Sequence, residues 1–177
     1  MGLFVLLAGA AAALAAPACP IDRAIYRHRT APGFTAGFIR QDRRKGTASD
    51  LAFWLKTPKR HTYYFSFSSP NGYGGSFIAP DVDPRRSIAA AEPIDPPAQP
   101  DEAEPALYEF DAFAADLSAF EMPPQARDKA PALLFARGLG PALNYAPSRL
   151  AAGAPGAEVE YLPIGLFEPA GCAPAKR

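Results

Sequence analysis

Proline and glycine recur so often along this chain that few stretches without them are long enough to form a long helix. The sequence holds 21 prolines and 14 glycines in 177 residues. Proline interrupts helical hydrogen bonding and interior strand pairing, and both residue types favour turns. The composition therefore argues against a helical bundle or a doubly wound α/β fold, and it favours short strands joined by turns.

Runs rich in aromatic and branched residues stand between these turn signals, and several of them alternate with period two, as half-buried strands do. The alternating apolar sets are Phe34, Ala36 and Phe38, then Leu51, Phe53 and Leu55, then Tyr63, Phe65 and Phe67. The predicted strands are 24–29, 34–41, 51–57, 62–69, 76–79, 107–113 and 159–167. Residues 113–120 have a helical option, and 132–139 fit either a strand or a short helix. We expect a mainly β fold: an antiparallel meander forming a sandwich or an open barrel, with at most one or two short helices.

Residues 80–105 are dense in proline and acidic side chains, a composition that buries too little apolar area to form part of a core. They could link two domains, but the segment after them is too short and too broken by proline to stand alone. We interpret them as an exposed loop within one domain.

The first 15 residues have the character of a cleavable secretory signal. Positions 2–16 contain only Gly, Leu, Phe, Val and Ala, and the small residues Ala13 and Ala15 suit cleavage after Ala15. The apolar run is shorter than the roughly 20 residues of a membrane-spanning helix, so a permanent anchor is the weaker interpretation. We expect a soluble periplasmic or secreted product, although the absence of Lys and Arg near Met1 leaves an upstream start codon open.

The chain has two cysteines, Cys19 and Cys172, at the two ends of the mature region. In an exported protein such a pair favours a disulfide, which here would close a single domain over residues 19–172. Lipid attachment at Cys19 is the alternative, but Pro17 and the lack of a preceding leucine argue against it. The spacing supports neither a redox motif nor a zinc site.

Few residues suggest catalysis. His28 and His61 are the only histidines, and each is better explained as a strand or turn residue than as a catalyst. We predict no metal site and no cofactor. The formal net charge of +0 gives no general electrostatic reason to expect nucleic-acid binding. Glu109 and Asp111 would share a strand face, but acidic residues are common on such faces.

A more specific hint is an aromatic and basic surface on the central hairpin. If the alternating apolar sets face the core, then Trp54, Lys56 and Tyr64 face outward, with Arg60 in the adjoining turn. Trp and Tyr beside cationic groups suit sugar stacking or a partner contact. The alternative is that residues 80–105 or the C-terminal segment cover this face and make Trp54 a core residue.

Three functional hypotheses follow. The leading one is a non-enzymatic exported β-domain that binds an envelope protein or polysaccharide through the Trp54, Lys56, Arg60 and Tyr64 surface. The second is a carboxylate-based hydrolase of cell-envelope material that uses Glu109 and Asp111. The third is a structural envelope protein without a ligand site.

Overall fold

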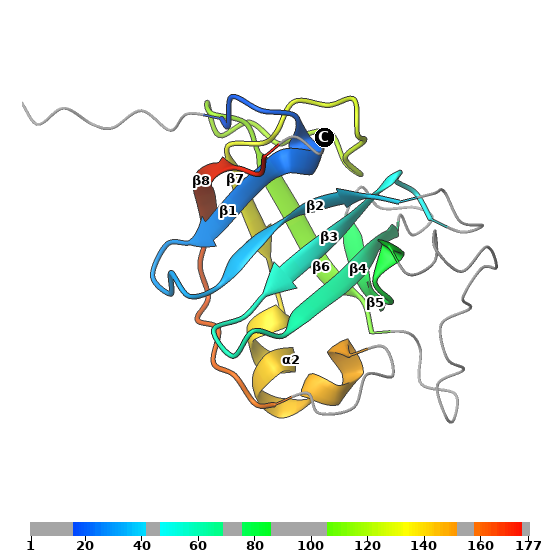
Figure 1. The fold of residues 1–177 in the computed structure, drawn as a ribbon, viewed down its shortest axis with the longest axis vertical. Helices are drawn as coiled ribbons and strands as arrows, with labels where there is room; N and C mark the ends of the chain where they lie inside the picture. The colour runs from blue at the N-terminus through cyan, green and yellow to red at the C-terminus, as the bar shows by residue number, and fades with distance from the viewer. Residues whose placement is uncertain (1–15, 42–46, 69–75, 86–105, 152–157, 175–177) are drawn as a thin grey trace, which may run out of the picture.

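The protein forms a closed, eight-stranded antiparallel barrel. A computed structural model describes residues 16–41, 47–68, 76–85, 106–151 and 158–174 (Figure 1). Each strand pairs with the next along the chain, and the last pairs with the first, so the meander closes on itself. The strands are β1 Ala24–His28, β2 Thr35–Arg40, β3 Leu51–Lys56, β4 Thr62–Ser68, β5 Phe77–Asp81, β6 Tyr108–Phe113, β7 Leu133–Ala136 and β8 Phe167–Cys172. The predicted mainly β meander is confirmed. Its sheet is a closed barrel rather than a sandwich or an open one.

Aromatic rings fill the interior of the barrel. The three alternating sets predicted to face inward are all buried. Phe110, from β6, lies at their centre, with its ring centroid 4.9 Å from that of Phe53 and 5.3 Å from that of Phe67. Inward-facing side chains of this size fill the interior of a small barrel. The interior is therefore a hydrophobic core and not a ligand chamber.

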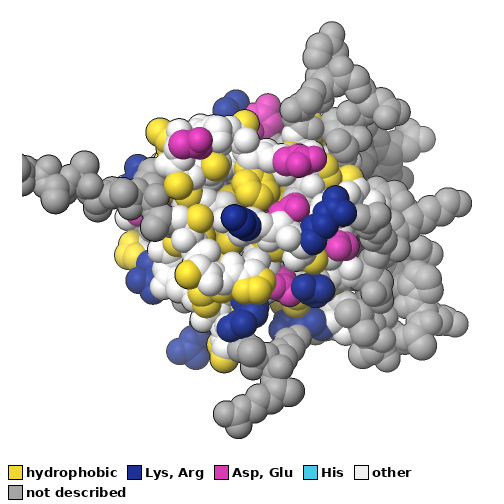
Figure 2. All heavy atoms as spheres, turned by 90° about the horizontal axis from the view of Figure 1, so that it is seen from above, with side chains coloured by type: hydrophobic (Ala, Val, Ile, Leu, Met, Phe, Trp, Pro, Cys, Tyr) yellow, Lys and Arg dark blue, Asp and Glu magenta, His cyan; other side chains and the backbone are white. Residues whose placement is uncertain are grey.

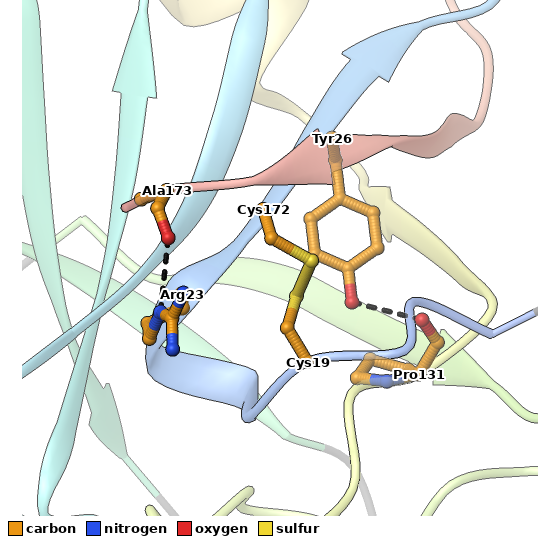
Figure 3. Close-up of a disulfide and its surroundings, with 6 residues drawn as sticks. All are labelled: Cys19, Arg23, Tyr26, Pro131, Cys172 and Ala173. Carbon is orange, nitrogen blue, oxygen red and sulfur yellow. Dashed lines mark hydrogen bonds between the residues drawn. A yellow bond between two sulfur atoms is a disulfide. The ribbon is translucent and has the colours of Figure 1, made fainter. Parts of the chain in front are cut away.

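The barrel closes along the seam between β1 and β8, and the disulfide lies at one end of that seam (Figure 3). Cys19 and Cys172 are bonded, with their Cα atoms 6.1 Å apart. Ala24 pairs with Cys172 in the strand register, and the Arg23 side chain donates a 2.9 Å hydrogen bond to the Ala173 carbonyl. The predicted disulfide is confirmed, and it joins the two ends of the sheet that must meet for closure.

Short helical segments lie at opposite ends of the barrel (Figure 1). The 3-10 turn η1, Ile21–Arg23, precedes β1 and buries Ile21 at the disulfide end. The helix α2, Leu139–Tyr145, buries Leu139 and Leu143 at the other end and is followed by the 3-10 turn η2, Pro147–Leu150. In the part of the chain that the structure describes, no helix is both long and apolar enough to cross a membrane.

Residues 113–120 do not form the helix that was one option for them. β6 continues to Phe113, and the chain then turns back so that Phe113 forms a bridge with Ala119. Leu117, at φ 65°, is 60% exposed, so it does not belong to a buried helical stripe. The apolar spacing that suggested a helix comes from a strand residue, Phe113, a bend residue, Leu117, and Phe120, whose amide donates to the Ala112 carbonyl.

The strand predicted at 159–167 is also wrong for most of its length. Residues 158–166 run outside the sheet from α2 to β8, which begins only at Phe167 (Figure 1). The amide of Glu160 donates a 3.2 Å hydrogen bond to the Leu143 carbonyl in α2, and Pro163 has no amide hydrogen to offer a ladder. The segment therefore packs on the helix.

Two predicted segments lie largely or wholly outside the described residues. The predicted signal, residues 1–15, is one, and most of the predicted acidic loop, residues 86–105, is the other. At the start of that loop the prediction needs a correction, because Pro80 and Asp81 belong to β5 and pair with β4.

Candidate functional site

The outer face of the barrel carries a row of residues from neighbouring strands that includes two of the predicted site residues. Trp54 of β3 lies opposite Gly37 of β2 on one side and opposite Tyr64 of β4 on the other. Arg85, just beyond β5, stacks over the Tyr64 ring. We call Gly37, Trp54, Tyr64 and Arg85 the aromatic row.

The indole of Trp54 lies directly over Gly37. A Cβ built on Gly37 would be 2.7 Å from Cζ2 and 2.9 Å from Cε2 of the indole, which is closer than real side chains approach. Nε1 donates a 3.3 Å hydrogen bond to the Phe38 carbonyl. Glycine in a strand often marks such a close approach. The ring is therefore fixed on the sheet surface, half-buried, with its polar group satisfied.

The phenol of Tyr64 is held by a guanidinium group. The Arg85 Cζ atom lies 5.5 Å from the ring centroid, and Nη2 of Arg85 donates a hydrogen bond to the Tyr64 hydroxyl. Asp83 also holds the guanidinium, with Nη2 to Oδ2 at 2.7 Å and Nε to Oδ1 at 2.9 Å. A bidentate pair of this kind orients the plane of an arginine side chain.

The pKa of Asp83 lies below its ordinary value. Burial alone raises it, but the hydrogen bonds and charge of Arg85, together with the Tyr64 hydroxyl, outweigh that effect. The carboxylate in turn raises the pKa of Arg85. The aromatic row therefore keeps a charged guanidinium beside its rings over the whole physiological pH range.

The other two predicted site residues lie differently. Lys56 is exposed near the end of β3, two residues beyond Trp54 on the same strand face. Arg60 is exposed in the turn after β3, at the end of the barrel near α2, with φ 69°. The neighbouring Lys59 pairs with Glu158 through Nζ and Oε2 at 2.6 Å. The structure thus groups Trp54, Tyr64 and Lys56 on one face and places Arg60 at its edge.

Sequence reasoning missed Gly37 and Arg85. Gly37 left a signal, because it is a glycine in mid-strand on the face opposite Ala36 and Phe38. Arg85 left none, since its place over Tyr64 depends on how the chain turns after β5.

The carboxylates of the hydrolase hypothesis lie on the outer side of β6. Glu109 is paired with Arg137, Oε2 to Nη1 at 2.8 Å, and both side chains are about half exposed or more. Asp111 faces outward on the same strand, opposite Phe135. Catalytic carboxylates usually lie in a cleft with partly apolar surroundings. The surroundings of Glu109 are those of a surface ion pair.

The barrel end that contains the disulfide presents both signs of charge. Acidic and basic side chains lie interspersed with apolar ones on this face (Figure 2). A mixed surface of this kind does not produce the one-signed field that steers a polyanion.

Comparison with known proteins identifies no relative from which a function could be inferred. No protein-family model matches the chain, and neither a curated protein nor a solved structure matches it significantly. Fold and surface together define a disulfide-closed antiparallel barrel with a packed interior and an aromatic row on its outer face.

Proposed function

We propose that this protein is an exported, non-enzymatic β-barrel that binds a polysaccharide of the cell envelope on its aromatic row. The observation that supports this most directly is the fixed indole of Trp54 over Gly37. A ring already fixed against the sheet can contact the apolar face of a sugar without losing further side-chain freedom.

Trp54 and Tyr64 occupy directly opposed positions on neighbouring strands. Adjacent strands lie about 4.8 Å apart, and the indole extends toward β2 over Gly37, so the aromatic surface spans more than one strand. Arg85, over the Tyr64 ring, and Lys56, two residues beyond Trp54 on the same strand face, add cationic groups that hydroxyl or carboxylate groups of a glycan could contact. An acidic or N-acetylated glycan suits this combination of rings and cations.

Trp54 is the only tryptophan in the chain, so its fluorescence reports on this site alone. The test titrates the protein with chitohexaose as an N-acetylated glycan and with oligogalacturonate as an acidic one. We expect a saturable change in tryptophan emission with at least one of them, and loss of the heat of binding in Trp54→Ala. Tyr145→Ala is the matched control, because Tyr145 is 84% exposed on α2 and lies outside the row. Binding that survives in Trp54→Ala would overturn the proposal.

Export is the second part of the proposal. A disulfide between Cys19 and Cys172 is typical of oxidising compartments, and the apolar stretch at residues 1–15 has the composition of a cleavable signal. Expression of the whole chain in a bacterium should give a periplasmic product whose intact mass is that of a chain starting at Ala16. Ala15→Phe should block the cleavage. A full-length product confined to the cytoplasm would exclude export.

A further inference from the structure

A cavity of about 340 Å³ opens where β7 and β8 separate. These strands pair only at Leu134 and Phe167. Beyond that point β7 leads into α2, while the chain reaches β8 from the helix side through residues 162–166 (Figure 1). The cavity fills this gap, and its volume falls within the range of small-molecule sites.

The wall of this cavity is almost entirely apolar. Of its twelve lining residues, only His28 and Arg137 have polar side chains. The buried side chains of His28 and Phe167 form its inner part, with their rings edge to face at 5.0 Å. Ile164, which is 87% exposed, stands at the rim. The cavity thus has a buried inner end and an open outer end.

The inner end is uncharged at neutral pH. The Ala31 amide donates a 3.1 Å hydrogen bond to Nδ1 of His28, so the neutral ring carries its proton on Nε2. Burial lowers the pKa of His28, and the Pro163 carbonyl, which can accept from the ring N–H, opposes this effect. The polar atom at the inner wall is therefore a neutral N–H donor that faces a backbone carbonyl.

Gly165 keeps the edge of this imidazole uncovered by a side chain. A Cβ on Gly165 would lie 2.8 Å from Nε2 of His28. Any other residue would push against the ring, so the glycine is needed for the close approach of the segment to His28.

Arg137 is the one cation among the described residues of the cavity wall. Its guanidinium lies 5.6 Å from the centroid of the Phe135 ring, and Nη1 pairs with Glu109. Because exposed ion pairs are weak, an anionic ligand can compete with Glu109 for this group. Both polar side chains of the wall are donors, and none of the described residues that line the cavity is acidic.

We propose that this cavity binds a small amphipathic anion, with its aromatic or aliphatic body against His28 and Phe167 and its carboxylate or sulfonate at Arg137. The site is separate from the aromatic row and does not depend on the function proposed for that row.

Two dyes that share one apolar body test this. The probes are 8-anilinonaphthalene-1-sulfonate and the uncharged N-phenyl-1-naphthylamine, each titrated into the folded, oxidised protein and followed by dye fluorescence. We expect saturable binding of both at one site per chain. Ala136→Phe, which fills the cavity, should weaken both by more than about tenfold. Arg137→Gln should weaken the sulfonate roughly two- to fivefold and leave the uncharged dye unchanged.

Three further variants keep the test decisive. Ile164→Glu changes an exposed rim residue, so it should fold normally and weaken the sulfonate more than the uncharged dye. Glu109→Gln, which frees Arg137, should leave sulfonate binding equal or tighter, and Trp54→Phe should leave both dyes unaffected. Absence of saturable binding, or equal binding of the sulfonate in wild type, Arg137→Gln and Ile164→Glu, would overturn the proposal.

Discussion

The indole of Trp54 occupies the space that a side chain at position 37 would need. A Cβ there would be 2.7 Å from indole Cζ2 and also 2.7 Å from the backbone carbonyl oxygen of Ala24 in β1. The second contact matters more, because a backbone oxygen inside a sheet cannot rotate away as a side chain can. Gly37 therefore sets both the orientation of the indole and the approach of two strands.

Gly37→Ala should destabilise the protein and move the indole. We expect the free energy of unfolding to fall by about 1 to 3 kcal/mol, as for other overpacked positions, and the tryptophan emission to shift to the red as the ring leaves the surface. Chemical denaturation and emission spectra measure the two effects. Thr35→Ala, on the same strand and face, is the control and should leave the emission unchanged. An unaltered emission spectrum in Gly37→Ala would contradict the close packing of the Trp54 indole on Gly37.

Removal of the disulfide should weaken the barrel without abolishing its sheet. The bond spans 153 residues, so the double variant Cys19→Ser/Cys172→Ser should lose about 2 to 5 kcal/mol of unfolding free energy, mainly through the unfolded chain. The β1–β8 ladder and the Ala173 amide bond to the Arg23 carbonyl remain. Denaturation of the wild type with reducing agent should match the double variant. Equal stability with and without the bond would contradict this expectation.

The strands that were easiest to predict from the sequence have one face in the core and the other on the outer surface of the barrel. In β2, β3 and β4 the buried residues of the inward face are all apolar and recur with period two, although Ile39 and Trp54 lie on the outward face, so the pattern identifies both the strand and its buried side. In β7 this signal is absent, because Leu133 and Leu134 are both buried, one on each side of the sheet. The α2 helix was not predicted because Gly140 and Pro141 lie within it and obscure its pattern.

The aromatic row and the cavity beside His28 also differ in how far they could be predicted from the sequence. Trp54 and Tyr64 could be placed on one face by alternation and register. The two cysteines predicted the bond between the ends of the domain, but not the closure of the barrel. The cavity beside His28 could not be predicted, since β1, β7, α2 and residues 162–165 all contribute to it and only tertiary structure brings them together. The guanidinium of Arg85 over Tyr64 is a tertiary contact of the same kind.

Tyr26 and Tyr63 provide a matched pair of buried hydroxyl groups. The Tyr26 hydroxyl donates a 2.8 Å hydrogen bond to the Pro131 carbonyl (Figure 3), whereas the Tyr63 hydroxyl has no partner within the described residues. Tyr26→Phe should cost about 1 to 2 kcal/mol, because the Pro131 carbonyl is left unpaired, and Tyr63→Phe should be neutral or slightly stabilising. Thermal and chemical denaturation of both variants check this, and equal losses would show that the hydroxyl bond is not the cause.

His28 should make the stability of the barrel depend on pH near neutrality. Burial lowers the pKa of His28 below its ordinary value of 6.5, so the unfolded chain takes up a proton at this residue more readily than the folded one. Stability is then complete above the unfolded pKa and falls as the pH drops through about 6.5 toward the folded pKa. The groups against the ring, the Ala31 amide, the Phe167 ring and the Gly165 backbone, do not titrate.

The measurement is the melting temperature at pH 7.5 and pH 5.5 in His28→Asn, His61→Asn and wild type. Asparagine at position 28 can still accept the Ala31 hydrogen bond, so His28→Asn should lose most of the change between the two pH values even if its melting temperature is lower at both. His61→Asn should retain the change. If the melting temperature of His28→Asn changes between pH 7.5 and pH 5.5 as much as that of the wild type, protonation of another group destabilises the barrel. The pH dependence would then not come from the neutral imidazole at the inner wall of the cavity.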